Sequence, residues 1–271
     1  MFADTITKCS NTARRIVDLA DKDKGAFWIS SAMAGAYVGL GIILIFTLGN
    51  ALMGSPVKGL VMGATFGIAL TLVIIAGAEL FTGHTMFLTF GVKSRAITTG
   101  DMLKVLPQTW LGNLIGSIAV AGFFALAGGG KLLGFDSSLL HKVALAKASG
   151  APMILFWKAV LCNWLVCLAI WMAQKTEGSA KFIAIWWCLL AFIASGYEHS
   201  IANMTVFALS WFGQHSNELT MAGIGNNLLW VSLGNTFSGV VLMGLGYWYS
   251  TPAVQRPVVT EQAEEMKLAQ A

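Results

Sequence analysis

Long apolar runs separated by short polar segments dominate the sequence. Uncharged stretches extend over residues 25–57, 59–78, 105–130, 159–174 and 219–255. Because about 20 apolar residues suffice to cross the hydrocarbon core of a bilayer, each stretch predicts a membrane-spanning helix. The pattern therefore predicts an all-α membrane protein with six spanning units, at residues 27–50, 58–90, 105–128, 152–175, 181–212 and 226–250.

Two of these units have the wrong length for a straight spanning helix. The second and the fifth are longer than one crossing needs, whereas two full crossings would need about 40 residues plus a turn. Gly77 and Gly83 in the second unit, and Gly196 in the fifth, supply flexible points in the backbone. We therefore expect each of these units to be a single span that is broken in its middle.

Short motifs recur at matching positions in the two halves of the chain. Gly-Ala-Glu at 77–79 matches Gly-Tyr-Glu at 196–198, and Gly-Asn at 112–113 matches Gly-Asn at 234–235. Since each half holds three spans, the second half enters the membrane from the opposite side, which makes an inverted repeat. Broken helices at matching positions of such repeats indicate a transport site near the midplane, and their freed N-termini favour an anion.

Composition and charge support this organisation. Of the 271 residues, 56% are hydrophobic and 11% are charged, against roughly 25% charged residues in soluble domains. Most lysines and arginines lie in the N-terminal segment, in the loops after the second and fourth units, and in the C-terminal tail. Cations in short loops stay in the cytoplasm, so both termini are expected there.

The expected organisation has three parts. Residues 1–26 form an amphipathic helix along the cytoplasmic interface or a disordered arm, 27–250 form the channel domain, and 251–271 form a disordered or loosely helical cytoplasmic tail. Within the channel domain, the inverted repeats cover about 27–130 and 150–250. The four cysteines show no metal-ligand spacing, so no metal or cofactor is expected.

Glu198 and His199 lie together inside the apolar fifth unit, flanked by small residues. An unpaired ionisable group away from water costs several kcal/mol, so at membrane depth it is a candidate for an ion pathway. The alternative for His199 is a buried neutral imidazole that hydrogen-bonds to backbone groups freed at the break. The sequence alone leaves both interpretations open.

Three segments carry a resemblance to a known family. They are AGAELFTGH at 76–84, LCNWLVCLA at 161–169 and ASGYEHSIANM at 194–204. These segments resemble motifs of the formate/nitrite transporter family, and FWISSAMAGAYVGLG at 27–41 and Gly-Tyr-Trp at 246–248 are similar to its bacterial nitrite channels. The resemblance covers nearly the whole chain.

The resemblance implies an aquaporin-like bundle of six helices with the second and fifth broken. It implies a homopentamer with one pore per protomer, embedded in the lipid bilayer of a bacterial cytoplasmic (inner) membrane. The implied cargo is nitrite, with formate or a broader set of small monovalent weak-acid anions as the alternative. The implied protein is no enzyme and binds no nucleic acid.

The resemblance also implies roles for individual residues. His199 is the central polar group of the pore, neutral when the pore is empty and donating a proton or a hydrogen bond as the anion arrives. Thr82 faces it from the other broken helix and Asn163 lies nearby. Hydrophobic constrictions are implied at Phe66 and Leu70 on the cytoplasmic side, and at Leu80, Phe81 and Phe192 on the periplasmic side.

Lys147 matches the family's vestibule lysine, which concentrates anions, although a solvated loop lysine is the alternative from sequence alone. We expect Glu79 and Glu198, with Asn203, to have structural roles at the breaks, each carboxylate accepting hydrogen bonds from freed backbone N–H groups. His84 stands where formate channels typically have a hydroxyl residue. A different class of function, a membrane enzyme or haem subunit, would use His84 and His199 as axial ligands.

Overall fold

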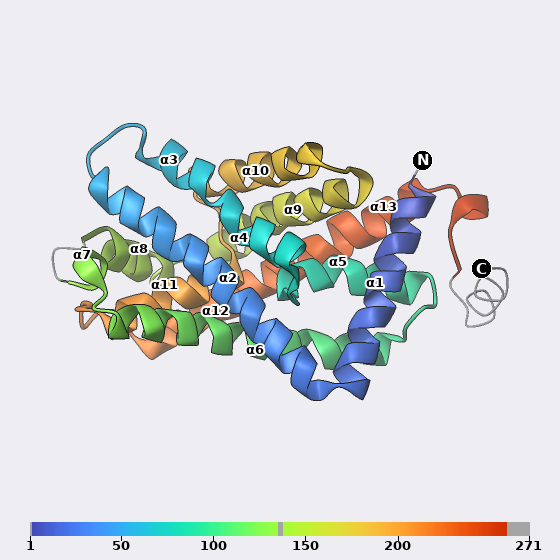
Figure 1. Ribbon diagram of the computed structural model, residues 1–271, viewed down its shortest axis with the longest axis horizontal. Helices are drawn as coiled ribbons and strands as arrows, with labels where there is room; N and C mark the ends of the chain where they lie inside the picture. The colour runs from blue at the N-terminus through green and yellow to red at the C-terminus, as the bar shows by residue number, and fades with distance from the viewer. Residues whose placement is uncertain (1, 135–137, 259–271) are drawn as a thin grey trace.

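The computed structural model describes residues 2–134 and 138–258. Every regular element in those ranges is a helix, and the spanning helices lie side by side along the long axis of the molecule (Figure 1). Five helices or helix runs are long and apolar enough to cross a membrane, and two shorter apolar helices form the fifth unit. The chain is therefore an all-α membrane protein, as the apolar runs predict.

The unbroken spans agree closely with the predicted units. They are α2 (Lys24–Ala51), α6 (Thr99–Leu126), α9 (Pro152–Lys175) and the consecutive helices α12 (Met221–Phe237), η2 (Ser238–Leu245) and α13 (Gly246–Ser250). The N-termini of α2, α6 and α12 are capped by side chains that accept a backbone N–H, from Asp23, Thr98 and Thr220 respectively. Helix α9 begins with Pro152 in its first turn.

The second span is broken, as its length predicts. It consists of α3 (Lys58–Thr65), α4 (Gly67–Thr71), the π-helix η1 (Leu72–Gly77) and α5 (Phe81–Lys93). Gly77 has a φ of 87°, which a side chain would disfavour, and Ala78 and Leu80 are extended.

The fifth span is broken at the corresponding place. Helix α10 (Ser179–Ala194) ends just before Gly196, which has a φ of 68°, and α11 (Ser200–Phe212) begins after an extended His199. Both predicted breaks are therefore confirmed. The extra interruption at Phe66 and the π-helical turns in η1 and η2 were not predicted.

The two ends of the bundle are covered by short helices. Helix α1 (Ala3–Lys22) lies across one end, and α7 (Gly130–Leu133) and α8 (Ser138–Ala148) lie at the other (Figure 1). We refer to these as the α1 end and the α8 end. The short 3₁₀ helix η3 (Ala253–Gln255) follows α13 at the α1 end, and residues 259–271 of the predicted tail lie outside the described range.

Helix α1 is amphipathic, and its apolar side packs on protein. Its buried residues Ile6, Cys9, Ala13 and Ile16 recur every three or four positions, which places them on one face. Ala13 lies so close to Gly91 of α5 that a Cβ there would come within 2.6 Å of the alanine methyl. The N-terminal segment is thus a docked helix rather than a free arm.

Close contacts between backbones hold the bundle together. A Cβ at Gly35 of α2 would overlap the Asn113 carbonyl of α6, and one at Gly116 would overlap the Ala32 carbonyl. In lipid, such small residues let helices approach closely enough for van der Waals packing to associate them. This contact fixes the third span, and therefore Asn113, against the first.

Candidate functional site

Two cavities enter the bundle from opposite ends. The α1-end cavity has a volume of about 400 Å³ and is lined by Arg15, Leu80 and His84, among others. The α8-end cavity, of about 340 Å³, is lined by residues including Lys147 and His199. A void of only about 10 Å³ lies between them and shares Leu80 with one cavity and His199 with the other. The three spaces form one interrupted path.

The narrow part of this path is apolar. Its lining includes Phe66, Leu70, Leu80 and Phe192, each at most 4% exposed. The rings of Phe66 and Phe192 meet edge to face with centroids 5.4 Å apart. A dry apolar constriction of this kind excludes bulk water and hydrated ions.

The grouping of the constrictions differs from the prediction, which placed Phe66 with Leu70 and set Phe192 on the other side. Phe66 instead contacts Phe192, and Phe192 also lines the α8-end cavity. Leu80 lines the α1-end cavity. The reason is chain direction: α3 and α4 run from the α8 end inward, so Phe66 lies one turn nearer that end than Leu70.

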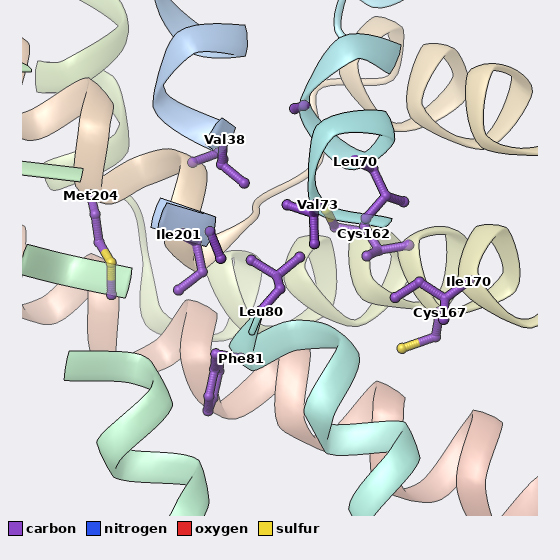
Figure 2. Packing of buried hydrophobic residues seen from close by; sticks show 14 of the residues in the cluster. Val38, Leu70, Val73, Leu80, Phe81, Cys162, Cys167, Ile170, Ile201 and Met204 are labelled. Carbon is purple, nitrogen blue, oxygen red and sulfur yellow. The ribbon is translucent and has the colours of Figure 1, made fainter. Parts of the chain in front are cut away.

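Phe81, also predicted as a constriction residue, is buried elsewhere. Leu80 has an extended backbone, so successive side chains point in opposite directions. Figure 2 shows Leu80 directed towards Val73 and Phe81 directed away from it. Phe81 is absent from the linings of both cavities and of the small void, which consist of described residues.

His199 lies at the boundary between the α8-end cavity and the narrow void. Its Nδ1 accepts the backbone N–H of Ala202 at 3.2 Å, which caps α11, and its Nε2 lies 3.1 Å from Thr82 Oγ1. Because Nδ1 is an acceptor, the proton of the neutral ring is on Nε2 and is donated to Thr82. The ring also stacks on Phe192, with centroids 6.0 Å apart.

Asn163 links α5 to α12 rather than lining the path. Its Nδ2 donates to the carbonyl of Thr82 at 3.3 Å and to that of Asn235 at 2.7 Å. The residue is completely buried on α9. The structure thus brings Thr82 and His199 together as side chains, while Asn163 reaches Thr82 only at its backbone.

At the α8 end, Glu198 is held by side chains. Lys147 Nζ donates to Glu198 Oε2 at 2.8 Å, and Asn203 Nδ2 donates to the same oxygen at 2.6 Å. The Lys147 side chain is 16% exposed and that of Glu198 is 7% exposed. Lys147 is therefore a cavity residue with a buried partner, not a free loop cation.

At the α1 end, Glu79 has a corresponding set of partners. Arg15 Nη1 donates to Glu79 Oε1 at 2.8 Å, and His84 Nε2 lies 2.8 Å from Oε2. His84 Nδ1 is 3.1 Å from Thr109 Oγ1. Sequence reasoning considered His84 only as an alternative haem ligand and as a departure from formate channels, and it counted Arg15 only as a cytoplasmic cation. The available signal for the pairing with Glu79 was that His84 and Asn203 each follow their glutamate by five residues.

Two asparagines, not the glutamates, satisfy the freed amides. Asn113 Oδ1 accepts the N–H of Phe81 at 2.9 Å, and Asn235 Oδ1 accepts the N–H of Ser200 at 2.9 Å. Each side-chain amide also donates to the glutamate carbonyl at its own break, 2.9 Å for Asn113 and 3.1 Å for Asn235. The expectation that the carboxylates bind the freed N–H groups is wrong, because the carboxylates already have charged or polar side-chain partners.

The arrangement of His84 and His199 does not favour joint ligation of a haem. His84 Nε2 is engaged with Glu79 and lines the α1-end cavity. His199 Nε2 is engaged with Thr82 and lines the other cavity. Axial ligation would require both rings to give up these partners and face a common space.

The family comparison agrees with this architecture. The family model described as formate/nitrite transporter matches residues 3–249. The nitrite transporter NirC of Escherichia coli strain K12 is 70% identical over 258 residues, which cover 95% of this chain and 96% of that protein. A probable formate transporter of Methanothermobacter thermautotrophicus is 35% identical, covering 92% of this chain and 96% of its own.

Solved structures show the same similarity. A protein described as an FNT family ion channel superposes with a TM-score of 0.91 at 70% identity, covering 93% of this chain and all of the other. A pentameric formate channel with formate bound gives a TM-score of 0.73 at 25% identity over 85% of this chain and 98% of the other. The chain belongs to the formate/nitrite transporter family.

Proposed function

We propose that this protein is a channel that passes nitrite across the membrane. The observation that carries the proposal is the His199–Thr82 pair at the boundary between a cavity that holds a lysine and a narrow apolar void. Its 70% identity to a nitrite transporter supports nitrite as the cargo.

In the proposed mechanism, the cavities collect the anion and the constriction strips its water. The anion then meets the Nε2–H of His199, which donates to Thr82 in the empty pathway. Exchanging Thr82 for an anion oxygen replaces a neutral hydrogen bond with a stronger charge-assisted one. His199 thus supplies hydrogen-bond stabilisation where the remaining surface is apolar, and no covalent chemistry is needed.

We further propose the assembly and orientation that the family relationship implies. A pentamer is supported by the similar formate channel, which is described as pentameric. Exposed apolar side chains such as Phe123, Leu126 and Trp187 are suited to lipid or to a neighbouring protomer. The cations gather at the α1 end, which supports placing that end in the cytoplasm. A bacterial cytoplasmic membrane is supported by the similar transporter of Escherichia coli.

The test is nitrite flux into proteoliposomes with His199 variants. Because His199 also caps α11, the informative pair is His199→Ala and His199→Asn; asparagine retains both a capping oxygen and an N–H donor. We expect His199→Ala to reduce the flux by about tenfold or more, because a hydrogen bond to a charged group contributes about 1.5–3 kcal/mol, and His199→Asn to retain more. Full flux in the alanine variant would contradict the proposed role.

Formate is the competing cargo, because the solved pentameric relative holds formate. Both anions are small and can accept a hydrogen bond from the same donor. Nitrite uptake measured with increasing formate separates the two: weak competition supports a nitrite channel, whereas exclusion of nitrite by equal formate supports a formate channel.

A further inference from the structure

His84 has hydrogen-bond partners that suit two protonation states. Its Nε2 faces the Glu79 carboxylate, which can only accept, so Nε2 carries a proton in either state. Its Nδ1 faces Thr109 Oγ1, and this hydroxyl also lies 3.0 Å from the carbonyl oxygen of Val105. When Nδ1 is unprotonated, the Thr109 hydroxyl donates its hydrogen to Nδ1. When Nδ1 is protonated, the hydroxyl donates to the Val105 carbonyl instead, and its oxygen accepts the Nδ1–H.

His199 does not have this freedom. Its Nδ1 accepts a backbone N–H from Ala202, and a backbone N–H is always a donor. A second proton on the His199 ring would set two N–H groups against each other and remove the cap of α11. The geometry therefore holds His199 neutral, whereas His84 can gain a proton without movement of any heavy atom.

The proton on His84 sets the charge of the α1-end cavity. The charged or ionisable side chains among its described lining residues are Arg15, Glu79 and His84. Arg15 comes from α1, while the groups facing the cavity from α2 and α9 include Ser30 and Gln174, which are uncharged. The formal charge of the Arg15–Glu79–His84 cluster is therefore zero with neutral His84 and positive by one unit with protonated His84.

The α8-end cluster lacks such a group. The charged side chains that line the α8-end cavity are Lys147, Lys158 and Glu198, whose formal charges sum to plus one. Asn203, which occupies the place corresponding to His84, has no ionisable group, and His199 is held neutral by its bond to Ala202. Any histidine-dependent change in anion attraction is therefore confined to one end of the pathway.

We propose that the protonation of His84 makes anion entry from the α1 side depend on the pH of that side. This inference rests on the proposed anion channel function and extends it. A proton from water at the α1 end binds Nδ1, the cavity becomes cationic, and a small monovalent anion is attracted; the proton returns to the same water, so none is passed to the cargo. A cleft of one charge sign raises the local concentration and the association rate of an oppositely charged ligand.

The first test follows the histidine rings directly and does not depend on transport. The full-length protein, with ¹⁵N-labelled histidine, is placed in lipid nanodiscs and its imidazole nitrogens are recorded between about pH 5 and pH 9, the range in which ordinary histidines titrate. We expect His84 to gain a second proton while His199 keeps a single proton on Nε2. Signals are assigned by their loss in His84→Asn and His199→Asn. A His84 ring that stays in one state throughout, or a His199 ring that titrates, overturns the inference.

The second test measures nitrite entry from the α1 side, with vesicles oriented through a tag on the C-terminal tail and leakage through empty vesicles subtracted. In the unmodified protein we expect entry to rise about tenfold over the pH interval in which the nanodisc experiment shows His84 gaining its second proton. The variant His84→Asn copies the Asn203–Glu198 arrangement already present at the α8 end. We expect its entry rate to change less than about twofold over this range.

His215→Asn is the matched control, because His215 stacks on Trp211 in the loop before α12, away from this cavity. It should retain the full pH response. If His84→Asn also retains it, the inference fails although the channel function stands. If the unmodified protein shows no nitrite flux, the proposed function fails, and the nanodisc titration alone then decides the behaviour of His84.

Discussion

The two helix breaks share one backbone design but differ in the groups around their glutamates. At each break, a buried asparagine from another span binds the first N–H of the new helix and the carbonyl of the glutamate. Beyond this, Glu79 is held by Arg15 and His84, whereas Glu198 is held by Lys147 and Asn203. The repeated part satisfies the backbone, and the different part defines the chemistry of each cavity.

This difference shows which features tolerate variation. The freed backbone groups at a break are the same whatever the cargo, and in a membrane each must have a partner inside the protein. The cations Arg15 and Lys147 come instead from α1 and α8, the helices that cover the two ends of the bundle. These cations bind the glutamate side chains and leave the backbone groups of the breaks to the asparagines.

The largest expected effect comes from removing the shared design. Asn113→Leu and Asn235→Leu each leave three backbone groups of the breaks or neighbouring helices without their partner. At about 1–3 kcal/mol for each buried unsatisfied group, we expect a loss of roughly 3–9 kcal/mol in either variant. The temperature at which the purified protein loses its single size-exclusion peak measures this loss.

Asn163→Leu serves as the comparison, because its amide donates only to carbonyl and hydroxyl oxygens and leaves both helix N-termini bonded. It should cost less than either of the other two. If Asn113→Leu or Asn235→Leu is as stable as the unmodified protein, the two breaks are not supported in the same way.

A smaller, asymmetric effect is expected from the cations. Lys147→Met leaves the buried Glu198 with only amide donation, so we expect a loss of about 3 kcal/mol, as for breaking a buried ion pair. The Arg15 side chain is 57% exposed, and Glu79 keeps His84 when Arg15 is removed. We therefore expect Arg15→Met to cost about 1 kcal/mol or less.

The same thermal assay compares the two variants, with Lys131→Met, an exposed cation at the α8 end, as the control for loss of one positive charge. Equal losses in Lys147→Met and Arg15→Met would show that the exposure of the cation does not decide its contribution. That result would contradict the expected difference in stability between the two ion pairs, although it would not change their hydrogen-bond geometry.

The sequence predicts the spans well because their ends are marked chemically. The fourth unit, 152–175, coincides with α9, since a proline starts the run and a lysine ends it. The broken helices were also predictable from the sequence, because a single span needs a fixed number of residues and a glycine marks the point at which the first half-helix ends. The π-helical turns in η2 were not, since an apolar run has the same composition in either helix type.

The site is less predictable because it depends on directions and on docking. The pattern located Glu79, Glu198 and His199, but not which way Leu80 and Phe81 point, and this decided the constrictions. Arg15 was missed because its contact with Glu79 spans 64 positions in the sequence and exists only once α1 docks on the bundle. Such contacts have no local signal.

The smallest expected effect tests whether the α8 end, which lacks a counterpart of His84, responds to pH in its covering helix instead. Burial, with a smaller contribution from His215, lowers the pKa of His141, which lies on α8 with Nδ1 2.8 Å from Ser210 Oγ. The folded state therefore binds a proton on His141 more weakly than the unfolded chain does. The free energy of unfolding is not reduced above the unfolded pKa of about 6.5, and it decreases as the pH falls from there through the lowered pKa of the folded state. The effect is well below about 1 kcal/mol because the ring is partly exposed to solvent.

This loss of stability is measured by hydrogen exchange of the α8 amides. The exchange is compared at about pH 7.5 and about pH 5.5, between which the charge of a histidine changes, after correction for the intrinsic rate. We expect faster relative exchange at the lower pH in the unmodified protein and no such change in His141→Gln, which stays neutral. A response that is unchanged in His141→Gln would assign the pH sensitivity of this end to another group. Because His141 does not line the α8-end cavity, this response concerns the stability of α8, and the difference in anion attraction between the two cavities still depends on His84.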